Sequence, residues 1–222
     1  MRMRTMRRDF DRRFAENSLA LAFIGMSGIG KTHQAKQFVP LGFRHISCDD
    51  LIAPRISGMT KLRNVTDVGI WMGQPYSKGY REREHRFLEL EEKVTREAID
   101  SIKGNTIIDT TGSVIYLSET IRQGLKENSF VVYFKAAPEM YKRMLKVYLE
   151  NPKPVVWGDS FRLKKGEDER AALKRSYPEL LEFRARKYQE LADVTITHDV
   201  LHECWDDVKL LRNTIRDGLT GN

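Results

Sequence analysis

The sequence predicts an α/β fold of three layers, with helices on both faces of a five-stranded parallel sheet. Two observations lead to this prediction. Short apolar segments of strand length recur along the chain, and amphipathic helical patterns lie between them. Strands that alternate with helices need crossover connections, and a sheet connected in this way is parallel and covered by helices.

The first apolar segment, residues 19–24, ends at a glycine and is typical of a strand buried on both faces. The expected strands are 19–24, 43–47, 106–109, 130–134 and 193–197. A helix is expected over 32–39. Further helical faces carry Phe87, Leu90, Val94, Ala98 and Ile102, then Met140, Met144, Leu145 and Tyr148, and last Trp205, Val208, Leu211 and Ile215. We interpret the methionine and aromatic stripes as core positions rather than cofactor contacts.

Composition excludes several classes of protein. The chain has 222 residues, of which 41% are hydrophobic, so it can bury the core of one domain and is not a disordered tail. No segment approaches the roughly 18 consecutive apolar residues of a membrane-spanning helix. Two cysteines cannot form a disulfide framework, which favours a reducing, cytoplasmic location. The net charge of +7 fits anionic partners without selecting one.

The first 18 residues hold six arginines against three acidic residues. This pattern predicts a basic N-terminal leader or a first helix. An organelle transit peptide is the alternative, but such peptides are poor in acidic residues.

The strongest motif directly follows the first strand. It matches G-x-x-x-x-G-K-[ST] and precedes the first expected helix, which is the context of a phosphate-binding P-loop. The loop reads Gly25-Met26-Ser27-Gly28-Ile29-Gly30-Lys31-Thr32. Its backbone N–H groups would surround phosphates, Lys31 would reach the β- and γ-phosphates of ATP, and the Thr32 hydroxyl would ligate Mg²⁺.

Acidic residues follow two other strands. Asp49, after the second strand, either orients the hydroxyl of a phosphoryl acceptor or caps the next helix. Asp109 ends an apolar strand, and it either holds Mg²⁺ through water or is a polar strand end. Residue types and spacing leave both pairs of alternatives open.

Two stretches do not fit the sheet plan. Residues 53–84 and 151–170 are expected above the carboxyl edge of the sheet, where substrates bind in such folds. We interpret 53–84 as an acceptor-binding excursion and 151–170 as a lid. Proline, glycine and charged residues predict few core contacts for the lid, and its Trp157 either stacks on a ligand or covers its own loop.

The P-loop, the acid after the second strand and the segment Arg184-Ala185-Arg186-Lys187-Tyr188-Gln189-Glu190-Leu191-Ala192-Asp193 together resemble shikimate kinase. That family has a similar R-x-x-x-Y-x-x-x-A-D segment before its last strand, and the likeness runs over about 19–197. The resemblance implies a P-loop kinase domain over 19–222, related in fold to nucleoside monophosphate kinases, with ATP and Mg²⁺ as cofactors.

The resemblance also implies roles for single residues. Asp49 matches the base-like, substrate-binding aspartate of the family. Arg86 is similar to the arginine of F-R-x-x-E, which grips the substrate carboxylate, and Arg184 resembles the second carboxylate-binding arginine. Lys153 stands where the lid reads R-P-L in the family. Arg143 resembles an arginine that lies against the nucleotide, although a solvated helix face explains it as well.

Three positions depart from the family pattern. Its D-x-D reads Ser47-Cys48-Asp49 here, its substrate-contacting G-G-G falls within Thr110-Thr111-Gly112-Ser113, and its lid arginine is Lys153. A lysine cannot bind an anion in the bidentate way of arginine.

The sequence therefore predicts a small-molecule kinase that phosphorylates a hydroxyl of an anionic acceptor, without naming that acceptor. A nucleotide or polynucleotide kinase and a non-catalytic nucleotide-binding module are the alternatives.

Overall fold

The computed structural model describes residues 2–56, 62, 65–151 and 153–219. Its centre is a sheet with the strand order β2-β3-β1-β4-β5, in which every neighbouring pair is parallel. The strands are β1 Ala20–Gly25, β2 Arg44–Ser47, β3 Thr106–Asp109, β4 Phe130–Lys135 and β5 Val194–Thr197. The predicted five-stranded parallel sheet is confirmed, with strand ends that match the expected ones or differ from them by a single residue.

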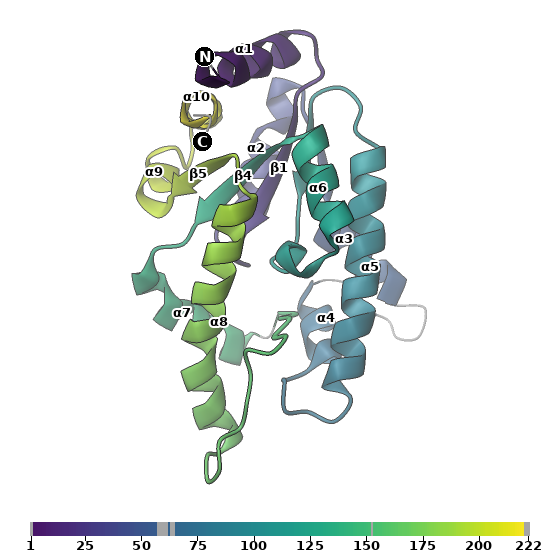
Figure 1. Ribbon diagram of the computed structural model, residues 1–222, viewed down its shortest axis with the longest axis vertical. Coiled ribbons are helices and arrows are strands. Elements are labelled where there is room, and N and C mark those ends of the chain that lie inside the picture. Colours follow the sequence, from purple (N-terminus) through teal and green to yellow (C-terminus); the bar gives the residue numbers. More distant parts are fainter. Residues whose placement is uncertain (1, 57–61, 63–64, 152, 220–222) are drawn as a thin grey trace.

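Helices cover both faces of this sheet, as predicted. In Figure 1, α6 and α8 lie in front of the strands and α2 lies behind them. The helices are α1 Arg2–Ala15, α2 Lys31–Gln37, α3 Cys48–Ile56, α4 Val65–Met72, α5 Tyr80–Asp100, α6 Glu119–Asn128, α7 Tyr141–Glu150, α8 Glu169–Leu191, α9 His198–Glu203 and α10 Val208–Gly218. Short 3-10 turns lie at Val39–Leu41, Val114–Tyr116 and Pro138–Met140. Every residue of β1 is buried, because helices pack on both sides of this central strand.

Some helix ends differ from the predicted faces. Ile102 lies beyond the end of α5, Met140 lies in the turn before α7, and Trp205 lies before α10. The 23 residues of α8 were not predicted as one helix. The buried stripe of α8 includes Ser176 and Arg184, and these polar residues interrupt the apolar period that marks a helix.

The two stretches outside the sheet plan take different forms. Residues 53–84 contain the end of α3, α4 and the start of α5, and the part at 57–61 and 63–64 lies outside the described residues. Between α7 and α8 the chain is irregular, with residue 152 outside the description. The expectation of few core contacts is wrong for Val155, Val156 and Trp157, which are all buried.

Helix α1 packs on the edge of the sheet opposite the P-loop. Phe10 is 1% exposed, and its ring lies 5.7 Å from that of Phe130, the first residue of β4. Phe14 stacks at 5.9 Å on Phe43, just before β2, and Asp11 lies 3.7 Å from Arg216 of α10. The basic segment therefore contributes to the core. None of the described helices has the length and apolar character that crossing a bilayer requires.

We expect Phe10→Ala to lower the free energy of unfolding by about 3 kcal/mol, because a buried aromatic side chain would leave a cavity. Denaturant unfolding measures this change. Arg8→Ala, on the exposed face of the same helix, is the control and should change it by less than about 0.5 kcal/mol. Equal stability of both variants and the parent would mean that α1 is detached in solution.

Candidate active site

The P-loop joins β1 to α2 at the carboxyl edge of the sheet. Two of its positions require glycine because of their backbone angles and their close neighbours. Gly25 has φ +141°, and a Cβ there would lie 2.6 Å from the carbonyl oxygen of Phe134 in β4. Gly30 has φ +107°, and a Cβ there would lie 2.8 Å from the ring of Trp205. Side chains other than hydrogen fit neither the backbone angles nor the space.

Lys31 is the first residue of α2, and its side chain folds back over the loop. Its Nζ donates hydrogen bonds to the carbonyl oxygens of Gly25 at 3.0 Å and Met26 at 3.2 Å. Burial lowers the pKa of Lys31, and the charges of Asp109 and Asp49 act in the opposite direction. The ammonium group therefore lies near both carboxylates. Thr32 is exposed in the first turn of α2.

The two candidate acids come from neighbouring strand ends. Asp109 ends β3 opposite Ser47 of β2, is 4% exposed, and lies 3.4 Å from Nε2 of His45. Asp49 lies in the first turn of α3 and is half-buried, whereas Asp50 is exposed. The Ser47 hydroxyl accepts a hydrogen bond from the Asp50 N–H at 3.2 Å, so Ser47 performs the capping that was considered for Asp49.

The environment of Asp49 is that of a carboxylate withdrawn from water. Its pKa is raised to about 6: burial raises it most and the charge of Asp109 adds to this effect, while Lys31 and Lys153 lower it. Above pH 6 the group is an anion beside two cations. It can accept a hydrogen bond or a proton from a hydroxyl group there.

Gly112 lies between the P-loop and Arg184. A Cβ at Gly112 would be 3.3 Å from the Ser27 nitrogen and 3.7 Å from an Arg184 guanidinium nitrogen. Arg184, only 5% exposed, donates to the Val156 carbonyl oxygen at 2.7 Å and lies over the ring of Tyr116. Its buried Nε has no hydrogen-bond partner among the described residues. Such a group can bind an anion.

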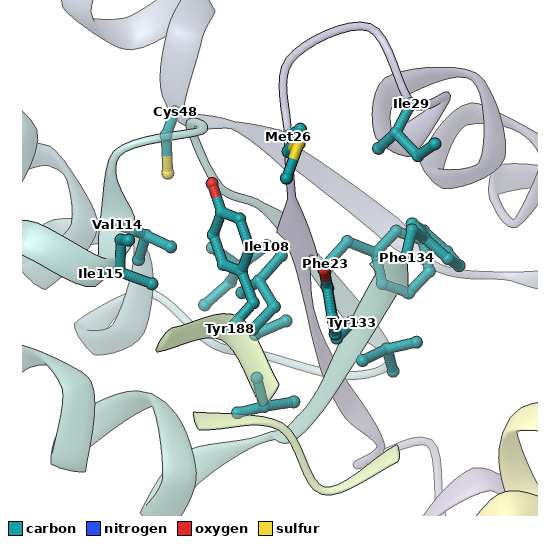
Figure 2. Close-up of a cluster of buried hydrophobic side chains, with 14 of the residues drawn as sticks. Phe23, Met26, Ile29, Cys48, Ile108, Val114, Ile115, Tyr133, Phe134 and Tyr188 are labelled. Atoms are coloured by element: carbon teal, nitrogen blue, oxygen red, sulfur yellow. The ribbon is translucent and has the colours of Figure 1, made fainter. Parts of the chain in front are cut away.

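A buried acid that the sequence analysis missed supports the loop after β3, at residues 110–113. Glu91 of α5 accepts hydrogen bonds from the hydroxyls of Thr111 and Ser113, the second at 2.5 Å. Burial raises the pKa of Glu91 to about 7. Tyr188 donates to the Gly112 carbonyl oxygen, and Figure 2 shows its hydroxyl pointing toward the end of the sheet at which Cys48 and Met26 lie. The sequence signal that could have identified Glu91 is its position on the apolar stripe of α5, between Phe87 and Val94.

The structure does not bring Arg86 to the site. The buried face of α5 carries Tyr80, Glu84, Phe87 and Glu91, and Arg86 is exposed because it lies well round the helix from that face. The F-R-x-x-E pattern also fits five residues earlier, as Tyr80-Arg81-Glu82-Arg83-Glu84, with tyrosine at the aromatic position. Arg81 forms an ion pair with Glu84 at 3.0 Å.

A cavity of about 390 Å³ opens beside the P-loop. Ser27, Gly28, Ile29, Met140, Arg143, Met144, Val147, Tyr148, Asn151, Lys153, Val155, Tyr177, His198, Leu201, His202 and Trp205 line it. Arg143 and Lys153 thus line the same cavity. The cavity has the size and the mainly apolar wall of a small-molecule site.

Trp205 also lines this cavity, whereas the sequence analysis assigned it to a helix face. Its ring stacks on His33 at 4.6 Å, and its carbonyl oxygen accepts hydrogen bonds from the side-chain amides of Gln34 and Gln37. All three contacts join residues more than 160 positions apart, so no local sequence pattern predicts them.

Across the described part of the chain, no three histidine, cysteine, aspartate or glutamate side chains gather as a metal site. One carboxylate and one hydroxyl fit Mg²⁺, because this ion is commonly held by one or two carboxylates together with phosphates and water. Thr32 and Asp109 are the predicted protein partners.

A parallel sheet that carries a P-loop, a carboxylate and cations at one edge is the arrangement of a P-loop nucleotide-binding protein. A model of the shikimate kinase family matches residues 72–210, well over half of the chain. The protein belongs to the shikimate kinase family, whose members use ATP, and it is a phosphotransferase that acts on an alcohol group of a small molecule.

Solved structures share this fold. Shikimate kinase from Bacteroides thetaiotaomicron is 19% identical with a TM-score of 0.59, and 90% of this chain and 97% of that chain are covered. Shikimate kinase from Acinetobacter baumannii, solved in complex with shikimate, is 20% identical with a TM-score of 0.56 over 90% and 98% of the chains. The Aquifex aeolicus enzyme is 17% identical with a TM-score of 0.51 over 89% and 99%. No curated protein sequence matches the chain.

We expect Asp49→Asn to lower turnover by roughly 10²-fold, the usual scale of a base or positioning group, while the dissociation constant for ATP stays within twofold. Asp50→Asn is the control and should leave both unchanged, because its side chain is exposed outside the site. Steady-state kinetics and calorimetry measure the two quantities. Full turnover in the Asp49 variant would remove this residue from the site.

The pKa of Asp49 predicts the pH dependence of the reaction. Its pKa of about 6 means that the required anion is protonated as the pH falls, so kcat/KM, which reports the free enzyme, should decline below about pH 6. A pH–rate profile measures this acid limb. In Asp49→Asn the limb should disappear, and an unchanged limb in that variant would assign it to another group.

Proposed function

We propose that this chain transfers the γ-phosphoryl group of ATP to a hydroxyl of a small anionic acceptor, with shikimate as the first candidate. One observation carries the proposal. The charges of Asp49 and Lys31 act on each other, and the buried cation Arg184, whose charge also acts on Lys31, lies beside Gly112 near the P-loop. An acceptor that bears both a hydroxyl and an anionic group matches Asp49 and Arg184.

The nucleotide would bind with its phosphates at the P-loop. N–H groups of residues 25–30 and the Lys31 ammonium would bind the β- and γ-phosphates. Its base would enter the cavity between Arg143 and Trp205. Thr32 and Asp109 would hold Mg²⁺, which when bound neutralises charge on the β- and γ-phosphates.

The transfer then forms a bond from the acceptor oxygen to the γ-phosphorus and breaks the bond from that phosphorus to the β,γ-bridging oxygen, leaving ADP. Asp49 orients the acceptor hydroxyl and takes its proton. Lys31 and Lys153 stabilise the charge on the transferring group. Arg184 holds the anionic end of the acceptor through a charge-assisted hydrogen bond.

A screen of pooled metabolites with labelled ATP tests this proposal. Label should appear on a small anionic alcohol, with shikimate included among the candidates. Transfer to a polynucleotide end, together with salt-dependent polynucleotide binding, would instead favour a polynucleotide kinase. Tight ATP binding without transfer to any acceptor would favour a non-catalytic nucleotide-binding module.

We expect Lys31→Ala to lower phosphoryl transfer by more than tenfold, because the variant loses the cation at the γ-phosphate. Lys36→Ala, exposed on the same helix, is the matched control and should keep the parent rate. Transfer rates and melting temperatures should be measured together. A Lys31 variant within tenfold of the parent would contradict the proposed phosphate contact.

A further inference from the structure

On one side, the backbone of residues 155–158 is held by two side chains of α5. Glu84 Oε1 accepts hydrogen bonds from the N–H groups of Trp157 at 2.6 Å and Gly158 at 3.0 Å. The Tyr80 hydroxyl lies 2.7 Å from the Val155 carbonyl oxygen and 2.7 Å from Glu84 Oε1. Three successive peptide groups are therefore bonded to α5.

The opposite side of the same segment is also fixed. Arg184 of α8 donates to the Val156 carbonyl oxygen at 2.7 Å. The Trp157 side chain is fully buried among the rings of Tyr148, Phe161 and Tyr177. Its Nε1 lies 3.3 Å from the Tyr148 hydroxyl, which donates to Gln74 at 2.6 Å. This seat joins α7 and α8 to the loop before α5.

The segment connects the two halves of the site. Tyr148, Val155 and Tyr177 line the cavity beside the P-loop, whereas Arg184, which bonds to the Val156 carbonyl oxygen, lies beside Gly112. Lys153, two residues before Val155, lines the same cavity, and its charge acts on both Lys31 and Asp49. The position of Lys153 depends on where the chain is fastened immediately afterwards.

Glu84 is the centre of this arrangement. It is 6% exposed, its Oε1 receives the two peptide N–H groups, and its Oε2 pairs with Arg81 at 3.0 Å. A buried carboxylate is stable only when its oxygens are hydrogen-bonded, and two of these donors belong to residues 157 and 158. Opening the segment would leave the carboxylate with fewer partners, so the carboxylate favours the fastened form.

We propose that Glu84 is a positioning residue of the phosphotransferase: it fastens residues 155–158 across the site and thereby sets Lys153 beside Lys31 and Asp49, and Arg184 beside Gly112. This inference rests on the proposed function for the roles of Lys153 and Arg184. The fastening itself does not depend on the identity of the acceptor. Glu84 acts through the peptide groups of the segment and touches neither the phosphates nor the reacting hydroxyl.

Amide hydrogen exchange and steady-state kinetics test the proposal in the full-length enzyme. In Glu84→Ala, exchange at Trp157 and Gly158 should accelerate at least about tenfold, the change that 1.4 kcal/mol of lost hydrogen bonding produces, while amides of β1 and β4 keep their rates. In the same variant kcat should fall at least about tenfold and KM for the acceptor should rise. The dissociation constant for ADP should stay within about twofold, because the P-loop holds its phosphates.

Two variants separate positioning from general destabilisation. Glu84→Gln keeps an oxygen that can accept both peptide N–H groups, so it should restore exchange rates and kcat to within about threefold of the parent. Glu89→Ala, on the exposed side of the same helix, should change neither. A loss of protection throughout β1 and β4 in Glu84→Ala would show a structural role and overturn the proposal.

Two further results would overturn it. One is exchange at Trp157 and Gly158 that is equally fast in the parent and in Glu84→Ala. The other is a Glu84→Ala variant that loses this protection and yet keeps kcat and the acceptor KM. A parent enzyme that phosphorylates no acceptor would refute the proposed function, and the exchange measurement would still decide whether Glu84 fastens the segment.

Discussion

The parallel pairing of the strands is the constraint on which the candidate active site depends. Pairing sets Asp109 of β3 opposite Ser47 of β2 and opposite Phe23 of β1, and it sets Gly25 opposite Phe134 of β4. Because all the strands run the same way, the P-loop, Asp109 and the start of α3 emerge at one edge. An acid from β3 and an acid from α3 thereby meet the cation of α2, although about 80 residues separate the first from the third.

Bringing these charges together has an electrostatic cost that the neighbouring groups offset. Burial raises the pKa of Asp49 and Glu91 and lowers that of Lys31, so each group by itself disfavours its charged form. The opposite charges near Lys31 and Asp49 counteract this effect. Fixed charges in a site shielded from water act strongly on charge that develops during phosphoryl transfer, which is the usual physical basis of such catalysis.

The departures from the family pattern have local explanations in the structure. Where G-G-G is expected, Thr111 and Ser113 bond to the buried Glu91, and a Cβ at Gly112 would lie 3.3 Å from the Ser27 nitrogen, a tight contact. Ser47 caps α3, and the carboxylate opposite it belongs to Asp109. The hydroxyls of Thr111 and Ser113 thus hold the loop after β3, where the family has glycines. Gly112 keeps the close approach of this loop to the P-loop.

The sequence by itself determined the strands, their parallel arrangement and the P-loop. These features depend on patterns of a few neighbouring residues: apolar runs of strand length, glycines at strained backbone angles, and a lysine and threonine at the start of a helix. Asp49 and Arg184 also came from the sequence, through a family pattern that compares positions one at a time. Each of these signals is local, so it can be recognised without knowing which residues pack against it in the folded chain.

Only the tertiary structure decided which side of each helix meets the site. Arg86 lies on the exposed side of α5, whereas Glu84 and Glu91 lie on its buried side, where peptide N–H groups and hydroxyls from distant segments receive them. Trp157 covers its own loop because its ring packs against those of Tyr148 and Tyr177. Trp205 lies outside the helix predicted for it and stacks on His33. A polar or aromatic residue gains its role from partners far away in the sequence, since burial and hydrogen bonding are properties of the packed chain and not of the local pattern.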